Sequence, residues 1–293
     1  MLDNNLKSYL ELQLIVFIWG FTAILGALIS LDALPLVWYR MLIAVGFVLI
    51  FMIWKKVDFK VSPKILLRLM TLGIIIALHW LTFFKAIKVS NVSVTLACLS
   101  TGAFFTAFLE PIFHKRKIIF YEILLGLIVV AGLFMIFQSN TLYIEGIILA
   151  LISAFLSALF SVVNGNLAKQ LPASTISFYE LASGVVFISI FLLVTSGFED
   201  KFFELTFNDW KYLLILSSVC TAYAFIASVK VMKYISPYTV MLTINLEPIY
   251  GIILALLIFG EKEHMGSHFY IGAGIILLTV LANGYLKMRI KKI

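Results

Sequence analysis

The sequence predicts an all-α integral membrane protein with ten transmembrane helices, arranged as two inverted five-helix repeats. Three observations support this prediction: the composition, the number of long apolar runs and the distribution of basic residues. Of the 293 residues, 62% are hydrophobic and 13% are charged. An ordinary soluble domain is about 45–50% apolar and about 25% charged. A soluble globule of this size could not hide so much apolar surface. The composition therefore excludes a disordered chain, a disulfide-stapled secreted module and a nucleic-acid binder.

Ten apolar runs are each long enough to cross a bilayer, which takes about 20 residues. The runs are 12–31, 35–54, 65–84, 91–112, 118–138, 143–167, 174–195, 210–229, 238–259 and 268–286. They leave no room for a soluble domain. The first run follows Lys7 as a signal peptide would, but it is too long for a typical signal, so we expect no cleavage.

The basic residues predict the orientation in the membrane. If the N-terminus is inside, 16 Lys and Arg residues lie on the cytoplasmic side and 5 lie outside, while Arg40 falls within the second run. This bias agrees with the positive-inside rule, and ten spans place both termini in the cytoplasm. We therefore expect a multi-pass protein of the cell inner (plasma) membrane. Cys98 and Cys220 lie in apolar runs, where we expect buried small side chains and no disulfide.

The two halves of the chain resemble each other weakly. A shift of 146 residues lays the run 91–112 on the run 238–259 without a gap, and Trp-Tyr-Arg ending at Arg40 parallels Phe-Tyr-Glu ending at Glu180. Five spans are an odd number, so the second half must enter the membrane from the opposite side. Inverted repeats of this kind are common in transporters that expose one site to each side in turn. The predicted repeats are 1–140 and 141–293.

Several short motifs accompany this frame. They are Trp19-Gly20, Arg40, Glu247-Pro248 and Phe259-Gly260-Glu261. With the five-plus-five arrangement, they resemble the drug/metabolite transporter superfamily, EamA type, over essentially the whole chain. Two positions depart from the common pattern, because Thr22 stands where many relatives carry Asn and Gly102 where many carry Pro. The resemblance implies a permease for small metabolites such as amino acids or related amines.

A polar stripe in the ninth run marks the first candidate site. Thr239, Thr243, Glu247 and Tyr250 are spaced by 4, 4 and 3 residues, which places them on one face of a continuous helix. Glu247 lies near the middle of the bilayer, where a charge costs about 2.5–3.5 kcal/mol. Its carboxyl group must be protonated, paired or hydrated in a cavity. We predict that it contacts a substrate ammonium group or couples transport to protons, with a structural acid as the alternative.

We expect a cavity between spans one, three, four, six, eight and nine. The predicted substrate-binding residues are Trp19, His79, Thr101, Asn164, Tyr223, Thr243, Asn245, Glu247 and Tyr250. The alternatives are a satisfied interior histidine at His79, core packing at Trp19, and close helix packing at the polar stripes. These stripes include Thr22 in the first run, Ser157 and Ser161 in the sixth, and Ser228 in the eighth. Arg40 could snorkel to the surface or gate the outer mouth. The opposite expected depths of Arg40 and Glu180 argue against a direct pair between them.

Spans five and ten should lie at the periphery. We expect their glycines to form packing contacts; these are Gly126, Gly132, Gly272 and Gly274.

The expected function is secondary-active, alternating-access transport, with export favoured as its direction. A membrane-embedded enzyme is an alternative, but its interior acids and histidines would be few; a non-transporting scaffold is another. The cluster Glu261, Glu263, His264 and His268 has one helical ligand spacing but no zinc motif, so we expect no metal. We also expect no catalytic residues, no cofactor and no nucleic-acid partner. The expected partners are a small-molecule substrate, protons and the lipid bilayer, and a homodimer remains open.

Overall fold

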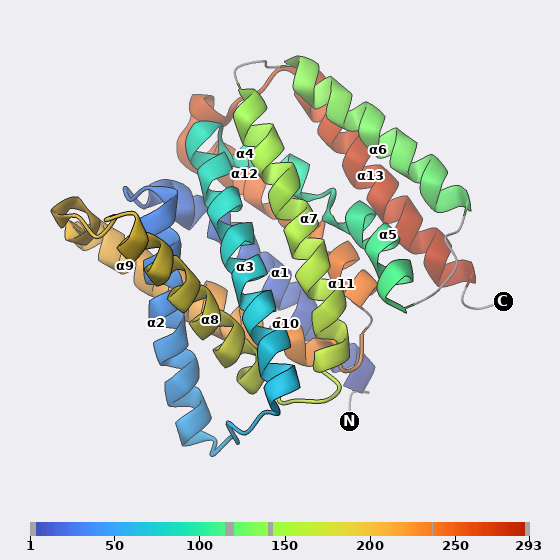
Figure 1. The fold of residues 1–293 in the computed structure, drawn as a ribbon. Coiled ribbons are helices and arrows are strands. Elements are labelled where there is room, and N and C mark those ends of the chain that lie inside the picture. Colours follow the sequence, from blue (N-terminus) through green and yellow to red (C-terminus); the bar gives the residue numbers. More distant parts are fainter. Residues whose placement is uncertain (1–3, 115–119, 140–142, 236, 291–293) are drawn as a thin grey trace.

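The computed structural model describes residues 4–114, 120–139, 143–235 and 237–290. Within these ranges the fold is entirely helical and contains no strand (Figure 1). The helices of the first half are α1 (Asn4–Leu28), α2 (Ala33–Trp54), α3 (Pro63–Val89), α4 (Val92–Leu99), α5 (Gly102–His114) and α6 (Phe120–Ser139). Those of the second half are α7 (Ile144–Leu167), α8 (Ala173–Val194), η2 (Asp200–Phe203), α9 (Phe207–Ser217), η3 (Ser218–Tyr223), α10 (Ala224–Val231), α11 (Pro237–Ile244), α12 (Glu247–Phe259), η4 (Gly260–Glu263) and α13 (Ser267–Ile290).

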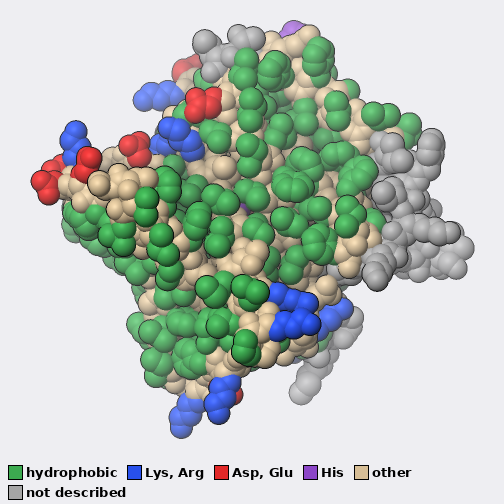
Figure 2. Space-filling model, viewed as in Figure 1, with side chains coloured by type: hydrophobic (Ala, Val, Ile, Leu, Met, Phe, Trp, Pro, Cys, Tyr) green, Lys and Arg blue, Asp and Glu red, His purple; other side chains and the backbone are tan. Residues whose placement is uncertain are grey.

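The chain is a multi-pass membrane protein. Seven helical segments of the described residues are long and apolar enough to cross a bilayer: Leu6–Leu28, Ala33–Trp54, Pro63–Val89, Val92–Phe113, Ile144–Leu167, Ala173–Val194 and Phe207–Val231. Two shorter apolar helices follow the same pattern, Leu124–Gln138 and Ser267–Asn283. Large apolar side chains such as Leu193 and Leu257 are 69% and 77% exposed. Hydrophobic side chains cover the middle of the surface, while the charged ones gather toward its upper left and its lower end (Figure 2). A surface of this kind fits a hydrocarbon environment.

Local capping determines where several helices begin. Ser62 accepts a hydrogen bond from the backbone N–H of Ile65, and Pro63 occupies the first turn of α3. Asn91 caps α4 in the same way, through the N–H of Val94. The first helix is described from Asn4, eight residues before the predicted apolar run, so the helix extends beyond that run at its N-terminal side. Its polar beginning is stabilised by an ion pair in which Lys230 Nζ lies 3.0 Å from the carboxylate of Glu11.

The fourth and ninth runs are each broken in the middle, whereas the sequence predicted continuous helices. The fourth run splits into α4 and α5 at residues 100–101, and the ninth splits into α11 and α12 at residues 245–246. Pro248 lies in the first turn of α12, where its missing N–H costs nothing. Both interruptions are tight turns, because Ser100 and Leu246 keep right-handed helical angles, and the N–H groups of Thr101 and Leu246 donate to the carbonyl oxygens three residues earlier.

The two breaks lie 145 residues apart, and the helices around them have matching lengths. Counted over the described residues, whose ranges end at His114 and resume at Pro237, α4 and α11 each have 8 residues, and α5 and α12 each have 13. α2 and α8 each have 22 residues, and Arg40 and Glu180 are both the eighth residue of their helix. The offset of 145 residues between the two breaks differs by one residue from the shift of 146 residues that the sequence favoured.

α6 and α13 pack against each other at one edge of the bundle (Figure 1). Their backbones approach closely, because a Cβ added to Gly132 would lie 3.0 Å from the carbonyl oxygen of Gly272, and one added to Gly272 would lie 2.7 Å from that of Gly132. Gly126 packs against the ring of Phe104. At Gly274 the expected packing contact is not found among the described residues, since none of their heavy atoms lies within 4 Å of the Cβ position there.

Candidate functional site

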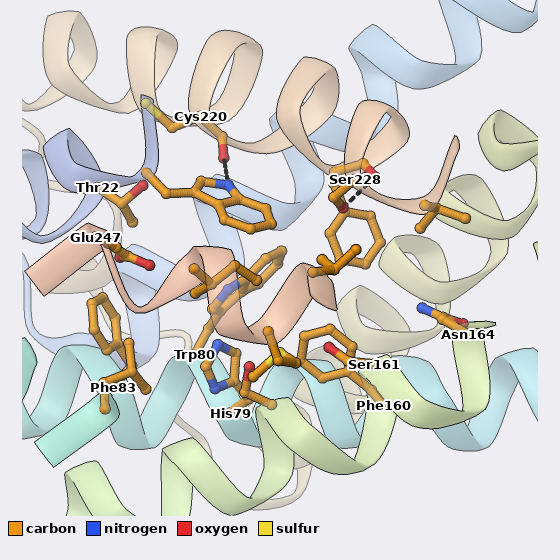
Figure 3. A pocket seen from close by; sticks show the side chains of 18 of the residues that line it. Thr22, His79, Trp80, Phe83, Phe160, Ser161, Asn164, Cys220, Ser228 and Glu247 are labelled. Atoms are coloured by element: carbon orange, nitrogen blue, oxygen red, sulfur yellow. Dashed lines mark hydrogen bonds between the residues drawn. The ribbon is translucent and has the colours of Figure 1, made fainter. Parts of the chain in front are cut away.

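A cavity lies between α1, α2, α3, the end of α4, α7, the η3–α10 span and the α11–α12 span (Figure 3). All six predicted spans contribute to its wall, and α2 adds Arg40. The lining residues are Trp19, Thr22, Arg40, His79, Trp80, Phe83, Leu99, Ser157, Phe160, Ser161, Asn164, Cys220, Phe225, Ser228, Val229, Met232, Val240, Met241, Ile244, Asn245 and Glu247. Apolar side chains make up more than half of the described lining, and polar side chains stand between them, as in most small-molecule sites.

Glu247 owes its place in this wall to the break in the ninth run. It is the first residue of α12 and is only 5% exposed. A helix N-terminus carries a partial positive charge, which stabilises an acid there. Among the described residues we find no hydrogen bond or ion pair at its carboxyl group. The neighbouring Asn245 likewise has a buried side-chain Nδ2 that lacks an acceptor in that part of the chain. Both groups remain available to a ligand.

Arg40 is the only Lys or Arg among the described lining residues, and it does not snorkel to the surface. Its side chain is 1% exposed, and its Nε donates a 2.7 Å hydrogen bond to Thr221 Oγ1. Its guanidinium carbon lies 4.0 Å from the ring centroid of Trp80 and 5.2 Å from that of Phe84, so both rings stabilise the cation. Nη1 is buried and has no acceptor within the described chain.

The cavity thus brings one cation and one acid together. Arg40 and Glu247 interact electrostatically, but no direct ion pair joins them within the described residues. Arg40 and Glu180 are not paired either, as the sequence predicted, because Arg40 bonds to Thr221 and Glu180 bonds to Asn164.

His79 lines the cavity, and Ser153 of α7 holds it in place. Its Nδ1 lies 2.9 Å from the backbone oxygen of Ser153, and Ser153 Oγ donates back to the His79 carbonyl oxygen over 3.0 Å. Nδ1 also lies 2.8 Å from Ser153 Oγ. A carbonyl oxygen can only accept, so the contact with the Ser153 backbone is a hydrogen bond in the tautomer that carries a proton on Nδ1. The histidine is therefore both an oriented interior side chain and a wall residue.

Aromatic side chains form much of the remaining wall. The His79 ring stacks on Phe83 with a centroid distance of 6.2 Å, and Trp80 meets Phe225 edge-on at 6.0 Å. Trp19 Nε1 donates to the backbone oxygen of Cys220 over 3.1 Å (Figure 3). That oxygen belongs to η3, a π-helical turn, and such turns are frequent at functional sites.

Five of the nine predicted binding residues line this cavity. They are Trp19, His79, Asn164, Asn245 and Glu247. The other four do not. Thr101 is fully buried and donates to the Cys98 carbonyl oxygen, while Thr243 donates to that of Thr239. Tyr250 packs edge-on against Phe17, and Tyr223 is 45% exposed.

Local backbone structure accompanies the absence of these residues from the described lining. The predicted stripe in the ninth run assumed a continuous helix, but Thr243 belongs to α11 and Glu247 to α12, with residues 245–246 between them. Tyr250 shares α12 with Glu247, but its ring packs against Phe17. Thr101 lies in the turn between α4 and α5. In the eighth span the π-helical turn shifts the inward face, so that Phe225 lines the cavity in place of Tyr223.

The sequence interpretation missed most of the aromatic wall and the role of Arg40. Trp80 and Phe83 share the His79 face of α3, a signal that the sequence did contain, whereas Phe160 and Phe225 look like ordinary core residues. A charged residue in the middle of an apolar run was the signal for Arg40. The predicted polar stripes did include Thr22, Ser157, Ser161 and Ser228, all of which line the cavity.

Glu263, from the cluster considered for a metal, has a structural role. Its two carboxylate oxygens accept hydrogen bonds of 2.9 Å each from the backbone N–H groups of Val92 and Ser93. The acid therefore caps the start of α4 and ties the turn after α12 to the broken fourth span. Cys98 and Cys220 are buried free thiols, as predicted.

The fold and the cavity define a multi-pass, all-helical membrane protein with an interior small-molecule site. Comparison with known proteins makes the class more specific, because the sequence profile of the EamA-like transporter family matches residues 6–138 and again residues 144–285. The chain belongs to this family, in the drug/metabolite transporter superfamily, and is a membrane transporter.

A curated relative is named as a transporter, and a solved structure shares the fold. An uncharacterized transporter of Archaeoglobus fulgidus is 28% identical over 269 residues, which are 88% of this chain and 91% of the relative. A crystal structure of another protein has the same fold, with a TM-score of 0.71 over 97% of this chain and 98% of that one, at 13% sequence identity.

Proposed function

We propose that this protein is a secondary-active, alternating-access transporter of a small zwitterionic metabolite, an amino acid or a related amine, and that it works as an exporter in the cell inner membrane. The observation that carries the proposal is the presence of Arg40 and Glu247 in one cavity without a direct bond between them. Each of the two buried groups lacks a charged hydrogen-bond partner among the described residues. A substrate with both charges would supply one partner to each.

The chemistry of the wall suggests how such a substrate binds. The substrate carboxylate would accept from Nη1 of Arg40, and its ammonium group would donate to Glu247. Charge-assisted hydrogen bonds of this kind are the strong ones. The rings of Trp80, Phe160 and Phe225 would surround an apolar or aromatic side chain. An amine without a carboxylate would use only the Glu247 end.

The broken helices support alternating access. Inverted-repeat transporters build midplane sites from discontinuous helices. Here α4–α5 and α11–α12 are broken at corresponding positions with equal lengths, and the family profile matches the chain twice. We therefore interpret residues 1–140 and 141–293 as two inverted five-helix repeats, with ten spans in total and both termini in the cytoplasm.

A ligand-stabilisation screen tests the substrate class. The purified protein is heated in detergent with amino acids, simple amines, monocarboxylates, sugars or nucleotides, and the melting temperature is recorded. A bound ligand stabilises the folded state by mass action, by about 2.7 kcal/mol at 100 times its dissociation constant. We expect apolar or aromatic amino acids to give the largest increase. If sugars or nucleotides stabilise the protein more than any amino acid, the zwitterion proposal is wrong.

Cysteine labelling tests the orientation. We expect single cysteines in the segment 55–64 or 114–117 to resist a membrane-impermeant thiol reagent in intact cells, and cysteines at positions 140 or 200 to react. The reason is the basic character of the first two segments, which should keep them in the cytoplasm. Of these positions, 115–117 and 140 lie outside the described residues. The parent protein, with only the buried Cys98 and Cys220, is the control. The reverse labelling pattern would contradict the proposed orientation.

A further inference from the structure

Glu180 is a second buried acid, and it lies outside the cavity lining. It belongs to α8 and is 0% exposed. Its Oε2 accepts a 3.2 Å hydrogen bond from Nδ2 of Asn164 in α7. Asn164 is 1% exposed and lines the cavity, at the end away from Glu247 in Figure 3. The amide of Asn164 therefore stands between Glu180 and the cavity.

Two oxygen atoms of this pair have no donor. Oε1 of Glu180 and Oδ1 of Asn164 are both buried, and neither has a hydrogen-bond partner among the described residues. Buried polar atoms without partners are rare and costly. An ionised carboxylate and an amide oxygen are both acceptors, so neither can satisfy the other. A single proton on Oε1 changes this, because the new O–H can donate to Oδ1 while Nδ2 donates to Oε2.

The neighbouring charges do not replace this proton. α2, α3, α7 and α10 surround the Glu180 side of α8, and Gly73 of α3 packs directly against the Glu180 backbone. The ionisable groups on these helices are Arg40 and Tyr39 on α2, Lys64, Arg68, His79, Lys85 and Lys88 on α3, Glu145 on α7 and Lys230 on α10. Within the described chain none of them forms an ion pair or hydrogen bond with Glu180. Burial of an ionised carboxylate without a cation is strongly unfavourable.

We propose that Glu180 is a proton-binding site, protonated in this conformation and connected to the cavity through Asn164. The protonated acid and the amide form a two-hydrogen-bond pair between α8 and α7. When the Asn164 side chain turns away, the O–H bond of Glu180 breaks, the proton passes to water in the cavity and the carboxylate remains. The cavity then has an ionisable acid at each end, Glu247 and Glu180. Glu180 would bind this proton whichever solute the protein transports.

Glu180→Gln is the matched substitution, because the glutamine amide can donate to Oδ1 and accept from Nδ2 but cannot exchange a proton. Infrared spectra of the purified protein at neutral pH report the protonated carboxyl group through its C=O stretch. We expect the difference spectrum between the wild type and Glu180→Gln to contain a carboxylic-acid C=O component. The same component should be retained in Glu247→Gln, which removes any separate band of the buried Glu247. The exposed acid Glu145, on the same helix as Asn164, supplies the control Glu145→Gln, which should also retain the band. A spectrum of Glu180→Gln identical to that of the wild type would overturn the proposal.

The melting temperature provides a second readout. The folded wild type holds a proton that the solvated carboxyl group of the unfolded chain releases, so stability should fall as the pH rises toward the point where folded Glu180 ionises. Glu180→Gln should lack this slope. If Glu180→Gln folds too poorly to measure, Asn164→Ala serves instead: it keeps the acid but removes its partner, so the C=O band should move in frequency. An unmoved band in Asn164→Ala, or an unchanged pH slope in Glu180→Gln, would refute the pair.

Discussion

Glu247→Gln should abolish proton-driven accumulation of substrate in proteoliposomes while leaving the protein folded. Glu247 is the only acid among the residues that line the cavity. Glu247 lies at the start of α12, at the break of the ninth span. Binding of a substrate to its carboxyl group and movement of α12 against α11 would therefore affect the same residue. Glutamine keeps the size of the side chain but can neither bind a proton nor carry the charge that an ammonium group needs.

The pattern of loss separates the two roles of Glu247. If the acid exchanges a proton with the substrate, Glu247→Gln should lose accumulation but keep counterflow, because counterflow needs alternating access without a gradient. If the acid binds an ammonium group, substrate binding and counterflow should be lost together. The matched control is Glu204→Gln, at an exposed acid that is not one of the described lining residues, and this variant should transport normally. Normal transport per folded molecule in Glu247→Gln, with only a lower melting temperature, would show that the acid is structural.

The helical composition of the fold could be predicted from the sequence, but the breaks in the helices could not. Long apolar runs define spans because the bilayer fixes their length, and Ser62 and Asn91 are ordinary capping residues at helix starts. Proline is an ambiguous signal for a break. Pro248 follows a break, whereas Pro111 lies inside α5 without interrupting it. Packing decides between these outcomes, and packing is not visible in one sequence.

The same limit explains the site. Polar residues at the centre of a span could be found by counting, and this identified Glu247, Asn245, Asn164 and His79. Which face of the helix they occupy depends on an unbroken 3.6-residue period, and that period fails at the breaks and at the π-helical turn. Phe160 and Phe225 were not identified, because a phenylalanine in an apolar run looks the same whether it faces lipid, the core or a cavity.

Arg40→Gln should weaken the binding of a zwitterionic ligand by about 10- to 100-fold, since the loss of a hydrogen bond to a charged group costs about 1.5–3 kcal/mol and each 1.4 kcal/mol is tenfold. Arg40→Lys is the informative partner. It keeps the charge over the Trp80 ring, but an ammonium group cannot reproduce the planar fork that bonds Thr221 and still presents Nη1. We therefore expect Arg40→Lys to bind more weakly than the wild type and more tightly than Arg40→Gln.

The ligand itself supplies the control for Arg40. An amine that matches the best amino acid but lacks the carboxylate should bind the wild type and Arg40→Gln equally, because it has nothing to offer the guanidinium group. The amino acid and the amine, each bound to the wild type and to Arg40→Gln, form a thermodynamic cycle. This cycle isolates the coupling free energy between the ligand carboxylate and Arg40. Dissociation constants from ligand-dependent melting in detergent complete the cycle. A coupling near zero, with both ligands weakened alike by Arg40→Gln, would mean that Arg40 supports the cavity wall through Thr221 and Trp80 and does not contact the carboxylate.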